Sequence, residues 1–187
     1  MHGENQKNLA MKVMWGIFKV IGLNFFQRIN ALLYTSKIFK SELENIKIYD
    51  GIEELFEFLE SKRYPFIIAT TSSQSEVDDR LSKFPRFFEK LKGKIISRSD
   101  VENLKPDPES LLKASEMMGL HPKRVVMVGD MHSDILMGKN TDSVTIAVLT
   151  GIFKKEDFEK YHPDLILYSA AQIPDNISKI RQLINSK

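Results

Sequence analysis

From about residue 50 to its end, the chain alternates short apolar runs with segments whose apolar residues recur at steps of three and four. The apolar runs are rich in β-branched residues, which is typical of strands buried on both faces of a parallel sheet. The steps of three and four indicate helices with one apolar side. The predicted strands cover residues 66–69, 94–97, 125–128, 144–148 and 164–167.

The predicted helices lie between these strands, at residues 50–60, 75–81, 110–118, 135–140 and 173–184. Asp50 is the expected N-cap of the first, and Pro108 suits the first turn of the third. Residues 84–93 are a loop or a short helix. This alternation predicts an α/β protein with a three-layer α/β/α, Rossmann-like core and a largely parallel sheet.

The N-terminal part has a helical pattern of its own over residues 9–34, which Gly22 and Asn24 divide into two helices. A short polar helix is expected at 36–45. Trp15, Phe18 and Phe25 give the 9–34 region an apolar stripe, which we interpret as a helix-packing surface. Interfacial membrane contact is the alternative. We therefore predict a helical domain at 1–46 and the α/β core at 47–187.

Composition and charge limit the classes of function. The 187 residues are 42% hydrophobic and 28% charged, which suits one globular domain with a small appendage. A net charge of +2 is too small to indicate nucleic acid as a partner. The absence of cysteine excludes disulfides, zinc–thiolate sites and thiol nucleophiles. No apolar span reaches membrane length and the polar start is no secretion signal, so we expect a cytoplasmic protein.

Two acidic residues follow the predicted strand at 125–128. Gly129 allows a sharp turn at its carboxyl end, where open α/β sheets bind ligands, and Asp130 and Asp134 come next. Two unpaired carboxylates repel each other, so the pair suggests a bound cation, and oxygen ligands suit Mg²⁺. The alternative is structural, with Asp130 as a turn residue or N-cap and Asp134 as an acid in the first helical turn.

Two other strand ends carry candidate phosphate ligands. Thr70 and Thr71 begin a run of four hydroxyl residues before a helix, a natural phosphate cradle, although a plain serine N-cap explains the run equally. Lys105 lies between Leu104 and Pro106 on a stiff segment, which suits a charge clamp, although most lysines are simply solvated. His132 is a candidate for the edge of the site.

The three strand ends together supply hydroxyls, a fixed cation and paired carboxylates, which phosphoryl transfer requires. In order and approximate spacing, Thr70, Lys105 and the Gly-Asp segment from Gly129 to Asp134 resemble motifs II, III and IV of the haloacid-dehalogenase-like (HAD) hydrolase superfamily. The phosphoglycolate-phosphatase-like branch, which has a helical cap, is the most similar. The resemblance covers residues 47–187.

This resemblance implies a Mg²⁺-dependent phosphomonoester hydrolase acting on a small phosphorylated metabolite. Thr70 would bond the transferring phosphoryl group and Lys105 would neutralise its charge. Asp130 would bind the metal directly and Asp134 would support the metal shell. The Gly-Asp form of motif IV is similar to that of phosphatases, so dehalogenation is disfavoured. Residues 1–46 would be the remaining part of the cap.

The chain departs from this family at its beginning. The family starts with a central strand ending in Asp-x-Asp, whose first Asp is the nucleophile, whereas no Asp precedes Asp50 here. The chain is then a fragment or a mis-started frame, an inactive binding or scaffold protein of the same fold, or a chain whose first strand another chain supplies. We favour the first, because a binder without turnover has no chemical need for Lys105 together with Asp130 and Asp134.

Overall fold

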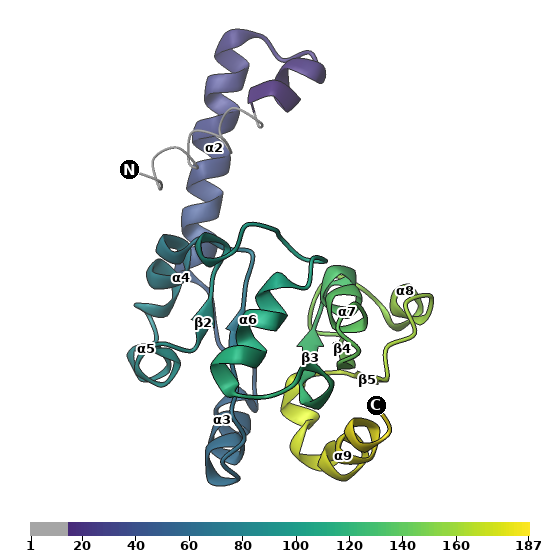
Figure 1. Ribbon diagram of the computed structural model, residues 1–187. Coiled ribbons are helices and arrows are strands. Elements are labelled where there is room, and N and C mark those ends of the chain that lie inside the picture. Colours follow the sequence, from purple (N-terminus) through teal and green to yellow (C-terminus); the bar gives the residue numbers. More distant parts are fainter. Residues whose placement is uncertain (1–14) are drawn as a thin grey trace.

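The computed structural model describes the backbone of residues 15–187, and the side chains of the same residues except 36–44. The beginning of the helix predicted at 9–34 therefore lies outside the described residues. Five short strands form two parallel groups (Figure 1). The first group pairs β1 (Ile68–Ala69) with β2 (Ile95–Ile96). The second has β4 (Val144–Val148) between β3 (Val126–Gly129) and β5 (Leu165–Leu167).

One face of the two strand groups is covered by helices near both ends of the core sequence. On the first group, Phe56 of α3 (Ile52–Ser61) packs with Phe87 of α5 (Pro85–Leu91) and with the strand residue Ile68. On the second group, Ile180 of α9 (Ile177–Asn185) packs on all three strands. Two 3-10 turns, η3 (Ala170–Gln172) and η4 (Pro174–Asn176), lead into α9, and η3 contacts α3.

The opposite face is covered by α6 (Glu109–Met118) and α7 (His132–Lys139). Helix α6 contacts both β1 and β2, and its Leu111 packs with Val125 and with Met137 of α7. In Figure 1, α6 accordingly stands between the two strand groups. The helix layers are therefore continuous across the two groups, and the predicted three-layer α/β fold is confirmed.

The strand burial differs from the sequence expectation. All five residues of β4 are buried, because it has a strand on each side. The four residues of β3 are only half-buried, although residues 125–128 were expected to be buried on both faces. The reason is that β3 pairs with β4 alone, as β1 pairs with β2 alone, among the described residues.

The N-terminal helices extend from the core rather than pack on it. A helical segment at 15–20 ends before Gly22, and α2 (Phe25–Glu44) then continues unbroken, so the separate helix predicted at 36–45 is wrong. Figure 1 shows α2 projecting away from the strands, and its Phe26 is 76% exposed. Within residues 15–187, no helix combines the length and apolarity needed to cross a membrane.

Several helix boundaries also differ from prediction. Gly51, at φ 77°, replaces Asp50 as the N-cap of α3, and a Cβ there would lie 2.7 Å from that of Ala171. Pro108 is the N-cap of α6 rather than part of its first turn. Helix α7 begins at His132, so Asp134 lies inside its first turn. The remaining elements are α4 (Gln74–Leu81), α8 (Lys155–Glu159), which was not predicted, η1 (Arg98–Asp100) and η2 (Pro122–Arg124).

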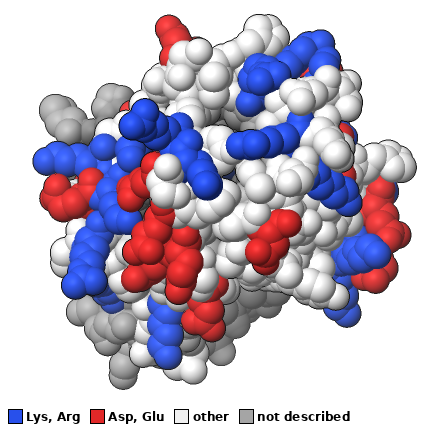
Figure 2. Space-filling view, turned by 90° about the horizontal axis from the view of Figure 1, so that it is seen from below, with Lys and Arg blue, Asp and Glu red and all other residues white. Residues whose placement is uncertain are grey.

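Charged side chains of both signs are interspersed on the face of the molecule that Figure 2 shows. Together with the net charge of +2, this distribution gives that face no extended region of one sign. Electrostatic steering of a polyanion requires such a region.

Candidate functional site

The side chain of Lys105 links the carboxyl ends of the two strand groups. Its Nζ donates one hydrogen bond to the carbonyl of Ala69, the last residue of β1, at 2.8 Å. It donates another to Oδ1 of Asp134, in the first turn of α7, also at 2.8 Å. The lysine and aspartate side chains are only 10% and 7% exposed. A buried ammonium is thus fixed at the edge where the sequence predicted the site.

Asp134 has both a structural and an electrostatic role. Its Oδ2 accepts a hydrogen bond from the backbone N–H of Met131 at 3.1 Å, as expected of an acid in the first turn of a helix. Its side chain lies directly over Gly129, and any Cβ at residue 129 would collide with it. Gly129 is therefore needed for this close approach as well as for the turn. Both carboxylate oxygens of Asp134 already have protein donors.

Asp130 lies beside this pair, between the ends of β3 and β4. A Cβ built on Gly151, in the loop after β4, would come within 2.5 Å of Oδ2 of Asp130. The side chain is half-buried, and no other described residue bonds to its carboxylate. Asp130 is thus the carboxylate of this edge whose oxygens remain available to a ligand.

The hydroxyl residues after β1 have different local roles. Thr70 donates its backbone N–H to Ile96, and its Oγ1 accepts from the N–H of Ser72 at 3.1 Å, which leaves the O–H of Thr70 to donate. Thr71 is exposed at the same edge. Ser73 is the N-cap of α4 in a capping box with Glu76, as the structural alternative for this run predicted. Thr70 and Thr71 therefore stay as candidates for binding phosphate, whereas Ser73 has a structural role.

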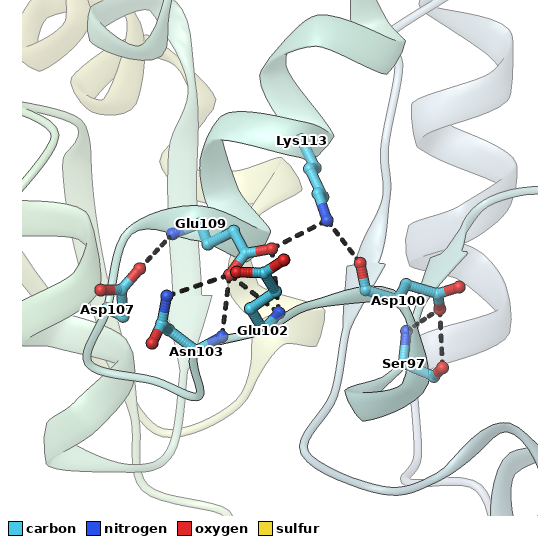
Figure 3. A network of polar contacts seen from close by, with 7 residues as sticks. All are labelled: Ser97, Asp100, Glu102, Asn103, Asp107, Glu109 and Lys113. Atoms are coloured by element: carbon cyan, nitrogen blue, oxygen red, sulfur yellow. Dashed lines mark hydrogen bonds and ion pairs between the residues drawn. The ribbon is translucent and has the colours of Figure 1, made fainter. Parts of the chain in front are cut away.

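A network centred on Glu109 holds the loop that carries Lys105 (Figure 3). The Glu109 carboxylate accepts the backbone N–H groups of Glu102 and Asn103, at 3.0 and 2.8 Å. Lys113, one turn further along α6, donates to Glu109 at 2.8 Å and to the carbonyl of Asp100. These contacts fasten the loop to α6 on the N-terminal side of Lys105.

The charges in this network are mutually stabilised. The hydrogen bond from Lys113 and those from the Asn103 and Glu102 amides lower the pKa of Glu109 to about 2. The hydrogen bond between Lys113 and Glu109 in turn raises the pKa of Lys113. Glu109 and Lys113 were not predicted as functional residues, although a Glu and a Lys four residues apart on a helix are a recognisable pair. Nothing in the sequence indicated that Glu109 also binds the loop.

The carboxylates at this edge fit a magnesium site only if a bound phosphorylated ligand and water supply the remaining oxygen atoms. No group of three or more His, Cys, Asp or Glu able to hold a metal occurs among the described residues. Mg²⁺ is usually bound by one or two carboxylates together with substrate phosphate and water. Asp130 fits the role of direct ligand because its carboxylate is available. Asp134, bonded to Lys105 and to Met131, fits a supporting role.

His132 does not face this edge. Its ring stacks on Tyr161 at 4.5 Å between centroids and lies against Phe153 and Phe158. This cluster packs under α8 and against β4. The suggestion that His132 lines the edge of the site is therefore not supported by its contacts.

The chain matches a known family of hydrolases. The model of the haloacid dehalogenase-like hydrolases matches residues 8–148, which include Thr70, Lys105, Asp130 and Asp134. The chain belongs to the haloacid dehalogenase-like hydrolase family. This hydrolase family was the one that the ordered motifs resembled.

Curated relatives of this haloacid dehalogenase-like chain include the pyrophosphatase PpaX of Bacillus mycoides, which is 32% identical over 139 residues, or 73% of this chain and 63% of the relative. PpaX of Bacillus cereus is 35% identical over 126 residues, or 66% of this chain and 56% of the relative. The chain thus spans about three fifths of the length of the curated relatives it matches.

Solved structures show the same fold at lower identity. A haloacid dehalogenase-like hydrolase of family IA from Entamoeba histolytica superposes with a TM-score of 0.72 at 23% identity, over 90% of this chain and 77% of that chain. A hydrolase from Pseudomonas syringae gives 0.70 at 19% identity, over 91% and 78%. These similarities support the fold.

Proposed function

We propose that the complete protein is a Mg²⁺-dependent phosphomonoester hydrolase that acts on a small phosphorylated metabolite in the cytoplasm. One observation carries this proposal: the buried ammonium of Lys105 lies between the end of β1 and the Asp134 carboxylate beside β3. Such a cation at the carboxyl edge of a parallel sheet is suited to an anionic ligand. The pyrophosphatase relatives support the same class of chemistry.

The residues of this chain would bind and orient the phosphoryl group. An ammonium has three N–H donors, and Lys105 directs two of them to Ala69 and Asp134, so the third serves a ligand oxygen. The O–H of Thr70 would donate to a second oxygen, and the exposed Thr71 to another. Asp130 would hold Mg²⁺, which when bound supplies charge neutralisation and Lewis acidity toward phosphoryl oxygens.

The chain does not itself provide the attacking carboxylate that the family resemblance implies. No Asp occurs among its residues before Asp50, and Asp50 itself precedes α3 rather than ending a strand. The proposed turnover therefore requires an Asp-x-Asp segment from outside the 187 residues. The same absence favours a second candidate, an inactive protein of this fold that binds a phosphorylated ligand or acts as a scaffold.

Hydrolysis of p-nitrophenyl phosphate, measured with and without Mg²⁺, separates the two candidates. The chain as it stands is compared with a version that carries an N-terminal strand ending in Asp-x-Asp. A matched version with Asn-x-Asn in that strand controls for the added residues. Magnesium-dependent turnover by the Asp-x-Asp version alone is the expected result.

Failure of every version, with phosphate binding retained, would instead support the inactive binder. In the active version, Asp130→Asn is expected to reduce the rate at least about 100-fold, the scale of losing one stabilising charge in a transition state. Undiminished turnover by that variant would refute the metal assignment. Thr70→Val, which removes one hydroxyl, is expected to cost about 10-fold or more on the same scale.

A further inference from the structure

A groove lies at the carboxyl ends of β4 and β5, next to the candidate site. It has a volume of about 700 Å³ and is lined by residues 149, 151–156 and 166–168. Most of these residues follow β4 or β5, so the groove opens on the edge of the sheet that carries Asp130. In Figure 1, α8 marks this end of the sheet, beyond α7 and away from α6. Small-molecule sites commonly have volumes of about 300–1,000 Å³.

Gly151 connects this groove with Asp130. It lines the groove, and a Cβ built on it would come within 2.5 Å of Oδ2 of Asp130. The hydroxyl of Tyr49 donates to the carbonyl of Thr150 at 3.1 Å and holds the loop at this position. Because residue 151 has no side chain, a ligand bound at Asp130 has room to extend past it into the groove.

Two large apolar side chains of the groove are mostly exposed. Ile152, on the loop after β4, is 84% exposed, and Tyr168, directly after β5, is 76% exposed. Phe153 and Ile166 line the same groove but are half-buried, in the apolar cluster around Phe158 of α8. Exposed apolar residues gathered around a hollow are typical of a binding surface.

An aromatic contact fixes the groove to the turn that carries Asp130. The ring of His132, two residues further along that turn, lies 3.9 Å from the ring of Phe153 between centroids. The groove and the carboxylate are thus held in one arrangement before a ligand binds. Such preorganisation reduces the entropy that a ligand loses on binding.

The charged side chains of the groove favour an anionic ligand. Lys154 and Lys155 line it together with a single acidic residue, Glu156. Both lysines are exposed, and neither ammonium forms an ion pair within residues 15–187. A negative group on a ligand in the groove would therefore be attracted to these lysines.

We propose that this groove binds the organic part of the phosphomonoester, and that this part contains a flat apolar ring and a second negative group. The inference rests on the proposed function, which places the phosphoryl group beside Asp130. Ile152 and Tyr168 would contact the ring, and Lys154 and Lys155 would attract the negative group. The substrate class is thereby narrowed to aromatic phosphomonoesters, since compact polar esters offer these apolar side chains nothing to bury.

Phenyl phosphate and methyl phosphate test the ring, because they differ only in the group esterified. Both are dianions at pH 8, since the second pKa of a phosphate monoester is about 6. Their binding to the full chain is followed by NMR with Mg²⁺ present, so no turnover is required. We expect phenyl phosphate to bind at least about 10-fold more tightly, because its ring leaves water.

The amide signals separate the groove from the phosphate site. The signal of Thr70 should shift with both esters, and those of Ile152 and Tyr168 with phenyl phosphate alone. Equal affinities with Ile152 and Tyr168 unmoved would overturn the groove proposal and leave the proposed hydrolase function standing. Shifts at these two residues without any at Thr70 would contradict the phosphate site, and with it the assignment of the groove to a phosphomonoester.

Two further results would also overturn the proposal. The first is the absence of binding by either ester. The second is a shift of the Ile152 and Tyr168 signals that grows with protein concentration in the absence of ligand, because a second copy of the chain would then occupy the groove.

Substitutions in the groove test the ring contact directly. Ile152→Ser and Tyr168→Ser should each reduce the preference for phenyl over methyl phosphate about 3-fold or more, because each removes apolar contact area. The affinity for methyl phosphate should stay unchanged and reports that the variants are folded. Leu112→Ser is the control, since Leu112 is 46% exposed on α6 and does not line the groove. An equal loss of affinity for both esters would show a merely structural effect and contradict the proposal.

The second negative group is tested with 4-carboxyphenyl phosphate. We expect it to bind about 3-fold more tightly than phenyl phosphate at low salt, the scale of an exposed ion pair. Lys154→Gln together with Lys155→Gln should abolish this advantage. Lys92→Gln together with Lys123→Gln removes the same charge outside the groove and should preserve it. The same advantage in both double variants would contradict the role of Lys154 and Lys155.

Discussion

Lys105 donates from Nζ to Oδ1 of Asp134 at 2.8 Å, and solvent reaches only 10% and 7% of these two side chains. A pair so shielded from water interacts more strongly than an exposed pair, and either charge alone would be costly to bury. The pairing also uses the Asp134 oxygen that would otherwise be available to a metal. Asp130 is then the carboxylate left for direct coordination.

Lys105→Met should lower the free energy of unfolding by about 3 kcal/mol, because it leaves the Asp134 carboxylate buried without its partner. Urea denaturation measures the change. Lys123→Met is the matched control, since Lys123 is 46% exposed and pairs with Asp142 at 3.6 Å. Exposed pairs contribute below about 1 kcal/mol, so the control should change little. Equal effects of both substitutions would contradict the special position of Lys105.

Gly129→Ala tests the close approach of Asp134 to the strand end. The added methyl group would occupy the space of the Asp134 side chain, so either the pair with Lys105 or the start of α7 must move. We expect a loss of about 1–3 kcal/mol of stability, as for overpacked sites. Gly16→Ala is the control, because nothing lies within 4 Å of a Cβ at that helical position. Thermal denaturation of the two variants should separate them clearly.

Glu109→Gln should loosen the loop before Lys105, because it removes the carboxylate that accepts from Glu102, Asn103 and Lys113. Exchange protection of the Glu102 and Asn103 amides should fall near neutral pH. Glu116→Gln on the same helix, where the side chain is exposed, should leave both amides unchanged. Unaltered protection in the Glu109 variant would show that the loop is held by other contacts.

The pH dependence of this network follows from the lowered pKa of Glu109, about 2 against an ordinary 4.5. A lowered pKa in the folded state contributes stability that is complete above pH 4.5 and is lost as the pH falls toward 2. Protection of the Glu102 and Asn103 amides, corrected for intrinsic exchange, should therefore be constant from pH 7 to about pH 5. It should decrease only in strong acid, and a decrease near neutral pH would contradict this assignment.

Asp164→Asn should lower the stability of the protein, because it weakens the contact between β4 and the residue that precedes β5. Oδ2 of Asp164 accepts both the N–H and the hydroxyl of Thr145, at 2.7 and 2.8 Å. Burial raises the pKa of Asp164, but these hydrogen bonds and the nearby Lys187 and Lys139 lower it overall. We expect a loss of about 1–3 kcal/mol, the cost of weakening hydrogen bonds to a charged group.

This loss should be measurable by urea denaturation near neutral pH and should shrink in acid, where the wild-type carboxylate becomes protonated. Asp142→Asn is the control, because the Asp142 side chain is 71% exposed and pairs only loosely with Lys123. A loss of equal size in the control would indicate a general charge effect rather than the contacts with Thr145.

The sequence predicted the fold where a pattern was long and local. Residues 144–148 form the strand expected of their apolar run. The strand expected at 66–69 is reduced to Ile68–Ala69, because its second edge has no strand partner among the described residues. Helix α2 continues across residues 34–36, where the sequence has neither glycine nor proline to end it. Helix α8 was missed because it is short and mostly charged.

The candidate site was predictable in its residue types but not in its pairings. The strand ends indicated Lys105, Asp130 and Asp134, since parallel strands end at one edge. The bond that commits Asp134 to Lys105 joins residues 29 positions apart, and no local pattern encodes it. The hydrogen bonds from the loop to Glu109 are likewise a tertiary feature. The sequence indicates only the pairing of Glu109 with Lys113, four residues further along the helix.

The division of the sheet also affects how the molecule unfolds. The β1–β2 half has its own apolar cluster around Phe56 and Phe87, and the β3–β5 half has another around Ile146 and Ile180. Since no strand within residues 15–187 is shared between them, the halves are coupled chiefly by helix contacts and by Lys105. We therefore expect the two halves to open as separate cooperative units, with the β1–β2 half, which has two residues in each strand, opening first.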